Sequence, residues 1–349
     1  MSGSKSIVFL YSELATYFLS CVSALADSYQ GDVYVVHWPV NPEAPFKFDF
    51  PSNVTFIEKK DVSDLQVYVE DKNPEIIVSI GWMDKDYVSI CKYFNATVKT
   101  VVTMDNQWEG SLKQKIACKV SRWVLRNKFQ YIWVPGKPQK IFAEKLGFKN
   151  ILLNYYCADV DHFNKYYEDQ SPRKHAEMPK RFLFVGRYMT HKGIYEMWNA
   201  FAKSNAKTDD KWELYCLGTG DEYEQRVEAD NLTHFGFVQP AELDEYLEKT
   251  SVFVLPSRFE PWGVVVHEYA VAGFPIISTN AVGAASAFVV PNSNGFVFNA
   301  GDEKELEKCF DKIINLSQSE LVEMSKKSHE IGMRLTPQIW ANELKSILN

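Results

Sequence analysis

Short apolar runs alternate with longer amphipathic stretches along most of this chain. Ile76–Ile80 and Val252–Leu255 are typical of the runs, because each is short, rich in β-branched residues and bounded by polar residues, Pro or Gly. The stretches between them repeat apolar residues every three or four positions, which predicts helices. Strands that alternate with helices form parallel sheets with both faces covered, so the pattern predicts an α/β protein with Rossmann-like layers.

The pattern places the expected elements as follows. Strands are expected at Ser6–Tyr11, Val33–Trp38, Val54–Glu58, Glu75–Gly81, Lys99–Met104, Tyr131–Val134, Arg181–Val185, Trp212–Leu217, Thr233–Val238, Val252–Leu255, Phe274–Thr279 and Gly295–Phe298. Helices are expected at Glu13–Asp27, Ser63–Asp71, Tyr87–Phe94, Ser111–Lys128, Lys192–Lys203, Ala241–Lys249, Val264–Ala272, Glu303–Leu316, Ser319–Ile331 and Pro337–Leu348.

A polar, Pro-containing break near the middle of the chain divides the alternating pattern into two domains. We predict an N-terminal domain over residues 1–165, a linker over 166–178 and a C-terminal domain over 179–336. The last helix, 337–349, is expected to cross back to the first domain. A length of 349 residues agrees with two domains.

Composition narrows the class of protein. With 46% hydrophobic and 24% charged residues the chain is typical of a globular protein, and a net charge of −7 argues against a nucleic-acid binder. The six Cys occur singly, without metal-ligand spacing, so we interpret them as reduced thiols. We find no signal peptide and no membrane-spanning run, and we therefore expect a cytoplasmic protein.

One carboxylate stands out inside the apolar helix that follows strand 252–255. Glu268 lies among Val264, Val266 and Tyr269, where a carboxylate without a partner is costly. It is either a solvent-facing or paired side chain of a half-buried helix, or a ligand-binding group. The helix begins at Gly263, and free N–H groups at a helix start attract phosphate.

The spacing along this helix favours a nucleotide ligand. Glu268 lies ~7–8 Å beyond Gly263 along the helix axis, from a rise of about 1.5 Å per residue. That is about the separation of a diphosphate from the ribose of the same nucleotide, so Glu268 could accept both ribose hydroxyls. Glu260, on the other side of the helix start, would then face whatever the diphosphate carries.

Two further turns follow strands of the second domain. Arg187 and Lys192 flank the turn after strand 181–185, where two cations would neutralise charge on a departing diphosphate. The alternative is a pair of solvated surface cations. Gly218-Thr219-Gly220 follows strand 212–217 and precedes an expected helix. It is either an ordinary βα turn or a place where the backbone approaches a nucleotide.

The first domain offers a polar loop at a strand end. Asp105, Asn106 and Trp108 follow strand 99–104, and strand ends line the crevice of parallel sheets. Polar groups beside a Trp suit a sugar acceptor, while an N-capping loop is the alternative. The paired carboxylates Asp84/Asp86 and Asp159/Asp161 have the spacing of a metal site, but loop and helix-capping roles are favoured.

The helix over residues 111–128 is basic. Residues 111–150 hold ten Lys or Arg and one acidic residue, although the whole chain is acidic. The cations Lys115, Lys119, Arg122 and Arg126 fall on one face of the helix, and Leu112, Ile116, Val120 and Trp123 fall on another. This pattern indicates contact with an anionic membrane surface. A solvated face of a helix packed on the sheet is the alternative.

The motifs of the second half together resemble the retaining nucleotide-sugar glycosyltransferases with the GT-B fold, the glycosyl transferases group 1. The residues that carry the resemblance are Val185-Gly186-Arg187, Lys192-Gly193, Phe235-Gly236-Phe237-Val238, Leu255 to Gly263, Glu268 and Ala272-Gly273-Phe274-Pro275. Within them, seven residues separate Glu260 from Glu268. Residues 130–300 carry it well, and the first 110 residues only in architecture.

The resemblance implies two Rossmann-like domains that face a central cleft, and it implies a role for each motif. Arg187 and Lys192 would hold the donor diphosphate, Glu268 the ribose, and Glu260 would lie by the donor sugar. The remaining donor-binding positions would be Gly186, Gly218, Phe237, Val238, Trp262, Gly263 and Val264. Members of this family need no metal or other cofactor.

The chain departs from the family in its first domain. Many relatives carry a His before the acceptor loop, where this chain has Met104-Asp105. We therefore take Asp105 as a catalytic candidate, and Asn106 and Trp108 as acceptor-binding candidates.

These observations predict an enzyme that moves a sugar from a UDP- or GDP-linked donor to a glycan or lipid-linked acceptor at the inner face of the cell membrane. A sugar-nucleotide epimerase or sugar phosphorylase of the same fold, and a non-catalytic subunit that binds a partner transferase, are the alternatives.

Overall fold

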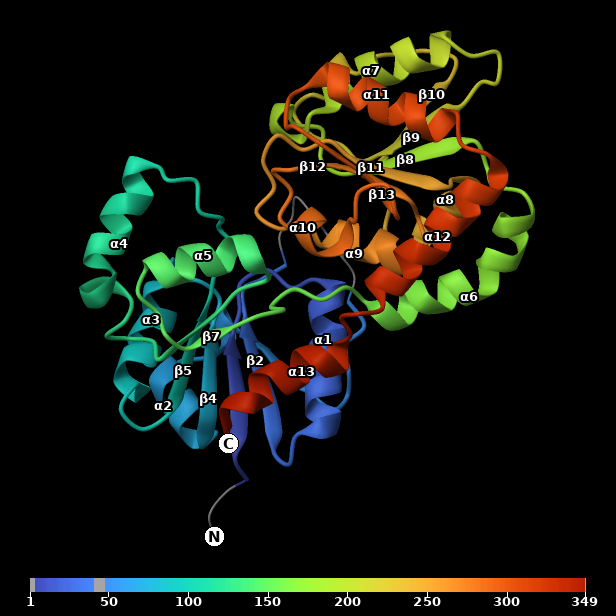
Figure 1. Cartoon of the computed structure of the whole chain (residues 1–349). Coiled ribbons are helices and arrows are strands. Elements are labelled where there is room, and N and C mark those ends of the chain that lie inside the picture. The colour runs from blue at the N-terminus through green and yellow to red at the C-terminus, as the bar shows by residue number, and fades with distance from the viewer. Residues whose placement is uncertain (1–3, 41–47, 349) are drawn as a thin grey trace. The chain divides into compact units, whose positions relative to one another are not determined.

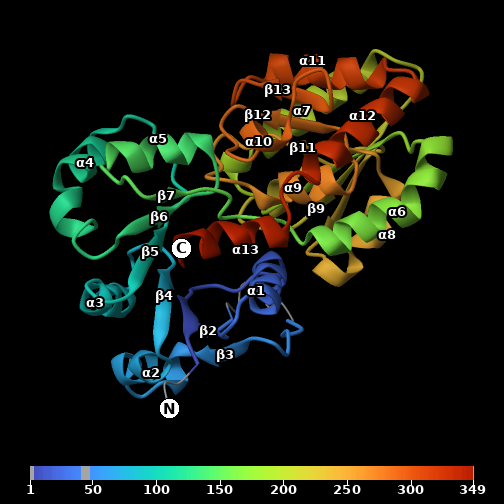
Figure 2. The same cartoon turned by 60° about the horizontal axis from the view of Figure 1, so that its bottom comes forward.

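The protein consists of two compact α/β units, seen in a computed structural model that describes residues 4–40 and 48–348. We call Met1–Asp159 with Leu335–Asn349 the N-terminal unit, and Val160–Arg334 the C-terminal unit. Each unit contains one parallel sheet with helices on both faces (Figures 1 and 2). The predicted fold class, two Rossmann-like domains, is confirmed.

The N-terminal unit has a seven-stranded sheet in the order β3-β2-β1-β4-β5-β6-β7. Its elements are β1 (Ser6–Leu10), α1 (Thr16–Ser28), β2 (Asp32–His37), β3 (Thr55–Glu58), α2 (Leu65–Asp71), β4 (Pro74–Ser79), α3 (Lys85–Phe94), β5 (Lys99–Thr103), α4 (Leu112–Val124), β6 (Tyr131–Trp133), α5 (Lys137–Lys145), β7 (Ile151–Leu152) and α13 (Pro337–Lys345).

The C-terminal helix α13 packs in this unit beside α1 (Figure 1). Trp340 on α13 is fully buried, and its ring stacks on Phe9 of β1 with 6.0 Å between centroids. Its indole N–H donates to the carbonyl of Tyr155 over 2.6 Å. A buried indole with a satisfied donor explains how a polar C-terminal segment is held against the sheet.

The C-terminal unit has a six-stranded sheet in the order β10-β9-β8-β11-β12-β13. Its elements are α6 (Val160–Ala176), β8 (Arg181–Val185), α7 (Ile194–Ala206), β9 (Glu213–Leu217), β10 (Leu232–Gly236), α8 (Leu243–Lys249), β11 (Val252–Leu255), α9 (Val264–Val271), β12 (Ile276–Thr279), α10 (Ala285–Phe288), β13 (Gly295–Phe298), α11 (Glu303–Ile314) and α12 (Gln318–Gly332). Helices α7 and α11 cover one face, and α9 and α12 the other (Figure 1).

The prediction of a linker over residues 166–178 is wrong. Helix α6 runs through this segment to Ala176 and belongs to the C-terminal unit, and the two units divide at Asp159. The helix buries Phe163 and Tyr166 while most of its other residues are polar. A stripe this narrow gives a weak apolar period, and Pro172 inside the helix adds a misleading break signal.

Helix α6 also buries a lysine. The Lys174 ammonium lies 3.9 Å from the ring centroid of Phe274 and donates to the carbonyl of Leu247 over 3.2 Å. Burial, with the charge of Arg173 as a smaller cause, lowers the pKa of Lys174 from 10.5 to about 7. Burial therefore destabilises the ammonium relative to the neutral amine in the folded protein.

The stability of the C-terminal unit should consequently depend on pH through Lys174. The unfolded chain keeps the proton up to a pKa of 10.5 while the folded chain loses it near 7, so the free energy of unfolding rises with pH between these values. We expect Lys174→Met to remove about 2 kcal/mol of that rise between pH 7 and 9. Denaturant unfolding at both pH values measures it. Lys165→Met, at an exposed position of the same helix, is the control. Equal pH profiles for the wild type and Lys174→Met would contradict the assignment.

Candidate active site

The candidate donor residues lie along one edge of the C-terminal sheet. All pairings in this sheet are parallel, so the carboxyl ends of its strands meet at the same edge. Four neighbouring strands, in the order β10, β9, β8 and β11, are followed there by the predicted donor residues. Such edges are where open α/β sheets bind ligands.

Lys192 and Glu260 form an ion pair at this edge. The Lys192 ammonium donates to Glu260 Oε2, and the Ser257 hydroxyl lies 3.5 Å from the same oxygen. The two charged side chains are only 15% and 17% exposed, so water screens the pair less than it screens a surface pair. The sequence assigned both residues to the reacting centre, and the structure brings them together.

The loops after β8 and β11 come into close backbone contact at a glycine. Gly193 follows the 3-10 turn Thr190–Lys192 with φ of +69°, and a Cβ at this position would lie 2.2 Å from the carbonyl oxygen of Pro256. Next to this contact the N–H of Arg258 donates to the carbonyl of His191 over 2.8 Å. Only glycine allows this approach, and the approach places Lys192 beside Glu260.

The electrostatics of the turn involve both predicted cations. Burial lowers the pKa of His191 below its ordinary 6.5, the charges of Lys192 and Arg187 lower it further, and Glu260 opposes them. Arg187 itself lies in the exposed part of the turn. A neutral imidazole beside two cations leaves the turn with positive charge available to an anionic ligand.

Glycines directly after β8 and β9 and at the end of β10 allow these backbones to lie close together. The N–H of Gly186 donates to Leu217, and the N–H of Gly218 donates to Gly236 over 2.6 Å. A Cβ on Gly218 would lie 2.0 Å from the carbonyl oxygen of Gly186. Gly218 is therefore required by backbone packing. The helix expected after Gly220 is wrong, because the chain forms only the short 3-10 turn Tyr223–Gln225 there.

Helix α9 begins at this edge as the sequence predicts. Gly263 precedes it with φ of +87°, and Val264 is its first residue. Glu268 is half-buried within the helix. The Trp262 ring is 2% exposed and meets Phe288 edge-on, so this side chain packs in the core. Only the backbone of Trp262 is therefore available to a bound nucleotide sugar.

The other predicted donor residues follow β10. Phe237 is 45% exposed, and Val238 is half-buried. Sequence reasoning gave no role of its own to Ser257, whose hydroxyl lies 3.5 Å from Glu260 Oε2. Ser257 is fully buried, and its carbonyl accepts from the Thr279 hydroxyl over 2.6 Å. A small polar residue directly after a buried strand was the available signal.

In the N-terminal unit, Asp105 lies beside the half-buried Tyr156, near the buried Tyr155 and Tyr11. The Tyr156 hydroxyl donates to Asp105 Oδ2 over 3.4 Å, and the hydroxyls of Tyr155 and Tyr11 lie 3.5 Å apart. Burial, with the nearby Tyr17, Tyr155 and Asp105 as smaller causes, raises the pKa of Tyr156 well above 10. These tyrosines remain neutral hydrogen-bonding groups at physiological pH.

The loop that contains the acceptor-binding candidates is held by helix α4. The Gln114 side chain accepts from the N–H groups of Glu109 and Gly110 and donates to the carbonyl of Gln107. The ring of Trp108 packs against Phe142, and the Lys145 ammonium lies 4.8 Å from the centroid of the Trp108 ring. Asn106 is exposed. The structure thus places Asn106 and Trp108 on one ordered loop.

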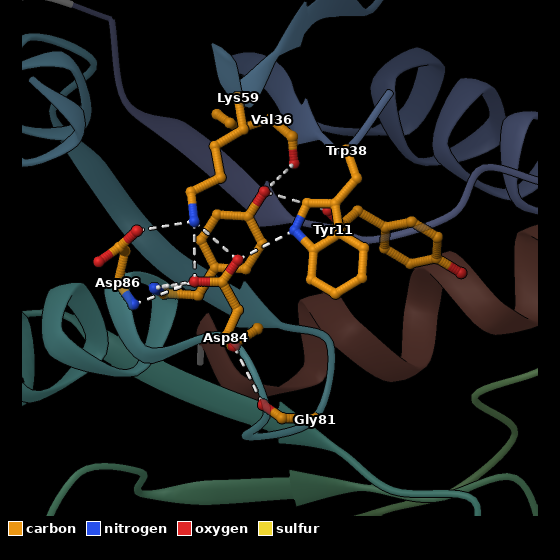
Figure 3. Close-up of polar contacts among 9 residues, drawn as sticks. Tyr11, Val36, Trp38, Lys59, Gly81, Asp84 and Asp86 are labelled. Atoms are coloured by element: carbon orange, nitrogen blue, oxygen red, sulfur yellow. Dashed lines mark hydrogen bonds and ion pairs between the residues drawn. The ribbon is translucent and has the colours of Figure 1, made fainter. Parts of the chain in front are cut away.

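The carboxylate pair Asp84/Asp86 serves as a helix cap and an ion pair (Figure 3). Asp84 accepts from the N–H groups of Asp86 and Tyr87 at the start of α3, from the Trp38 indole over 2.9 Å, and from Lys59. Burial alone would raise the pKa of Asp84, but Lys59 and these donors hold it below its ordinary value. The favoured capping interpretation is confirmed. Within residues 4–40 and 48–348, no group of three or more His, Cys, Asp or Glu is placed to hold a metal ion.

The two sheets and their helices define the protein as one with the GT-B fold of glycosyltransferases. The structure of Anabaena Alr3699/HepE in complex with UDP superposes with a TM-score of 0.73 at 13% identity, over 98% of this chain and 99% of that one. Residues 167–330 match the family Glycosyl transferases group 1, which confirms the resemblance to that family.

Curated relatives align with part of the chain. An uncharacterized glycosyltransferase of Haemophilus influenzae is 29% identical over 43% of this chain and 43% of its own length. The capsular polysaccharide biosynthesis glycosyltransferase CapM of Staphylococcus aureus is 25% identical over 60% of this chain and 58% of its own length. Both alignments therefore span less than two thirds of the relative.

Proposed function

We propose that the protein is a retaining glycosyltransferase that moves a sugar from a nucleoside-diphosphate sugar to a glycan or lipid-linked acceptor in polysaccharide or glycoconjugate synthesis. The observation that carries this proposal is the half-buried Lys192–Glu260 pair at the carboxyl edge of the C-terminal sheet, with Lys192 in the same turn as Arg187. It lies within the segment that matches the family. The UDP complex of the Anabaena protein supports a nucleotide donor.

In this proposal the C-terminal unit binds the donor. Arg187 and Lys192 neutralise the diphosphate as its bond to the sugar breaks, and the start of α9 adds N–H groups. Glu268 accepts from the ribose hydroxyls, Phe237 and Val238 lie by the base, and Glu260 orients the sugar. The cations then supply the charge that a metal ion supplies elsewhere, so the proposed reaction needs no metal.

The N-terminal unit is proposed to bind the acceptor through Asp105, Asn106 and Trp108. The acceptor oxygen bonds to the sugar carbon on the face that the diphosphate leaves, and the acceptor proton passes to the departing diphosphate oxygen. This sequence retains the configuration of the sugar carbon. We place the reaction at the cytoplasmic face of the membrane, where nucleotide sugars and lipid-linked acceptors meet.

Nucleotide binding by the purified chain tests this function. We expect UDP or GDP, and the matching nucleotide sugars, to raise the melting temperature, because a ligand that binds only the folded state stabilises it. Glu268→Ala should weaken this shift, since the ribose loses its acceptor. An unchanged melting temperature with every nucleoside diphosphate would refute the assignment. Donor conversion without any acceptor would favour the epimerase alternative.

A further inference from the structure

Helix α4 exposes an apolar stripe as well as its charges. Ser121 is the one residue of this helix that is buried. The stripe consists of residues spaced by helical turns along one side, namely Leu112, Ile116, Val120 and Trp123, which are 74%, 53%, 39% and 66% exposed. The alternative interpretation, in which the apolar side of this helix packs on the sheet, is wrong. A helix in water normally turns such a stripe inward, so these residues require another explanation.

Basic residues border this stripe. By helical spacing, Lys115, Lys119 and Arg122 lie along one side of it, Lys113 lies along the other, and all four are exposed. The surrounding segment 111–150 has ten basic residues and one acidic residue in a chain of net charge −7. Positive charge is therefore concentrated where apolar surface is exposed.

The start of α4 is fixed in direction. The Ser111 hydroxyl caps the helix by accepting from the N–H of Gln114, and the Gln114 side chain ties the helix to the acceptor loop. In Figures 1 and 2, α4 lies at the margin of the N-terminal sheet. A helix held by its first turn presents its stripe in a defined orientation.

We propose that α4 lies in the plane of an anionic lipid bilayer, with the apolar stripe in the acyl boundary and the bordering cations at the headgroups. An apolar stripe that contains a Trp and is bordered by Lys and Arg is the pattern of an interfacial helix. A second copy of this chain is a poorer partner, because it would bring like charges together. No helix in the described ranges has the length and apolarity to cross a membrane.

This inference deepens the proposed function, because it names the surface at which a lipid-linked acceptor is met. Gln114 belongs to α4 and holds the loop of Asp105 and Trp108, so lipid contact would bring the acceptor loop near the bilayer. Lipid binding is measured without any sugar transfer. The failure of one proposal is therefore distinguishable from the failure of the other.

Vesicle sedimentation tests the proposal with two α4 variants. We expect the full chain to sediment with phosphatidylcholine vesicles that contain about a third phosphatidylglycerol, and not with pure phosphatidylcholine. Replacing Lys115, Lys119 and Arg122 by Gln should weaken binding about tenfold or more, because each cation near an anionic surface contributes. Replacing Leu112, Ile116 and Trp123 by Gln should abolish it, although every charge remains.

The matched control replaces the exposed Lys165, Lys304 and Lys308 of the C-terminal unit by Gln, which changes the net charge equally and should leave binding unchanged. All variants should keep their melting temperature and their UDP shift. Absence of wild-type sedimentation, or wild-type sedimentation of the apolar variant, overturns the proposal. So does a wild-type dimer that the apolar variant converts to a monomer without any vesicle binding.

Discussion

Replacing Lys192 by Met should lower the rate constant of sugar transfer about 100- to 1,000-fold, the range for the loss of one group that stabilises developing charge. The ammonium is half-buried beside Glu260 and lies in the same turn as Arg187, whose charge reaches His191. Met is an unbranched side chain one heavy atom shorter than Lys, and it removes the positive charge and its N–H donors. Initial rates with saturating donor measure the loss.

The matched control for this variant is Lys203→Met. Lys203 also pairs with a glutamate of the C-terminal unit, Glu303, but this pair lies on the helices α7 and α11, at the face of the sheet. We expect wild-type transfer from it. The Lys192→Met variant should keep its melting temperature within a few degrees and lose most of its UDP shift. Wild-type turnover by Lys192→Met would remove Lys192 from the reaction.

The sheets could be predicted from the sequence because their strands are continuous apolar runs. The observed β8 and β11 have the predicted bounds Arg181–Val185 and Val252–Leu255. The proximity of Lys192 to Glu260 follows from the pairing of these two strands, which are separated by β9 and β10 in the chain. Local patterns do not determine such non-local pairing. The order of the motifs indicated the proximity of Lys192 to Glu260 only through the resemblance to the glycosyl transferases group 1.

The contacts that shape the candidate site were not visible in the sequence. Gly193 belongs to one of the motifs that carry the resemblance, but glycine is needed there because of the carbonyl of Pro256, 63 residues later in the chain. Ser257 beside Glu260 carried little signal of its own. The exposure of Ile116 and Trp123 follows from the tertiary packing around α4, which the local sequence does not determine. Periodicity finds an apolar face but does not say what covers it.

Replacing Gly193 by Ala should reduce both the stability of the C-terminal unit and the activity. The residue has φ of +69°, where a Cβ is strained, and that Cβ would lie 2.2 Å from the backbone oxygen of Pro256. We expect a loss of about 2–5 kcal/mol in the free energy of unfolding, the sum of backbone strain and overpacking. Denaturant unfolding measures it.

Gly301→Ala separates the two causes, because Gly301 has φ of +80° and nothing lies within 4 Å of a Cβ placed there. This control carries only the backbone strain, so we expect it to cost about 1 kcal/mol and to leave transfer unchanged. In Gly193→Ala the relief of the clash must separate the loops after β8 and β11, which moves Lys192 away from Glu260. UDP affinity and transfer should therefore fall even in the fraction that remains folded. Equal losses in the two variants would mean that the close contact between Gly193 and Pro256 does not position the cation.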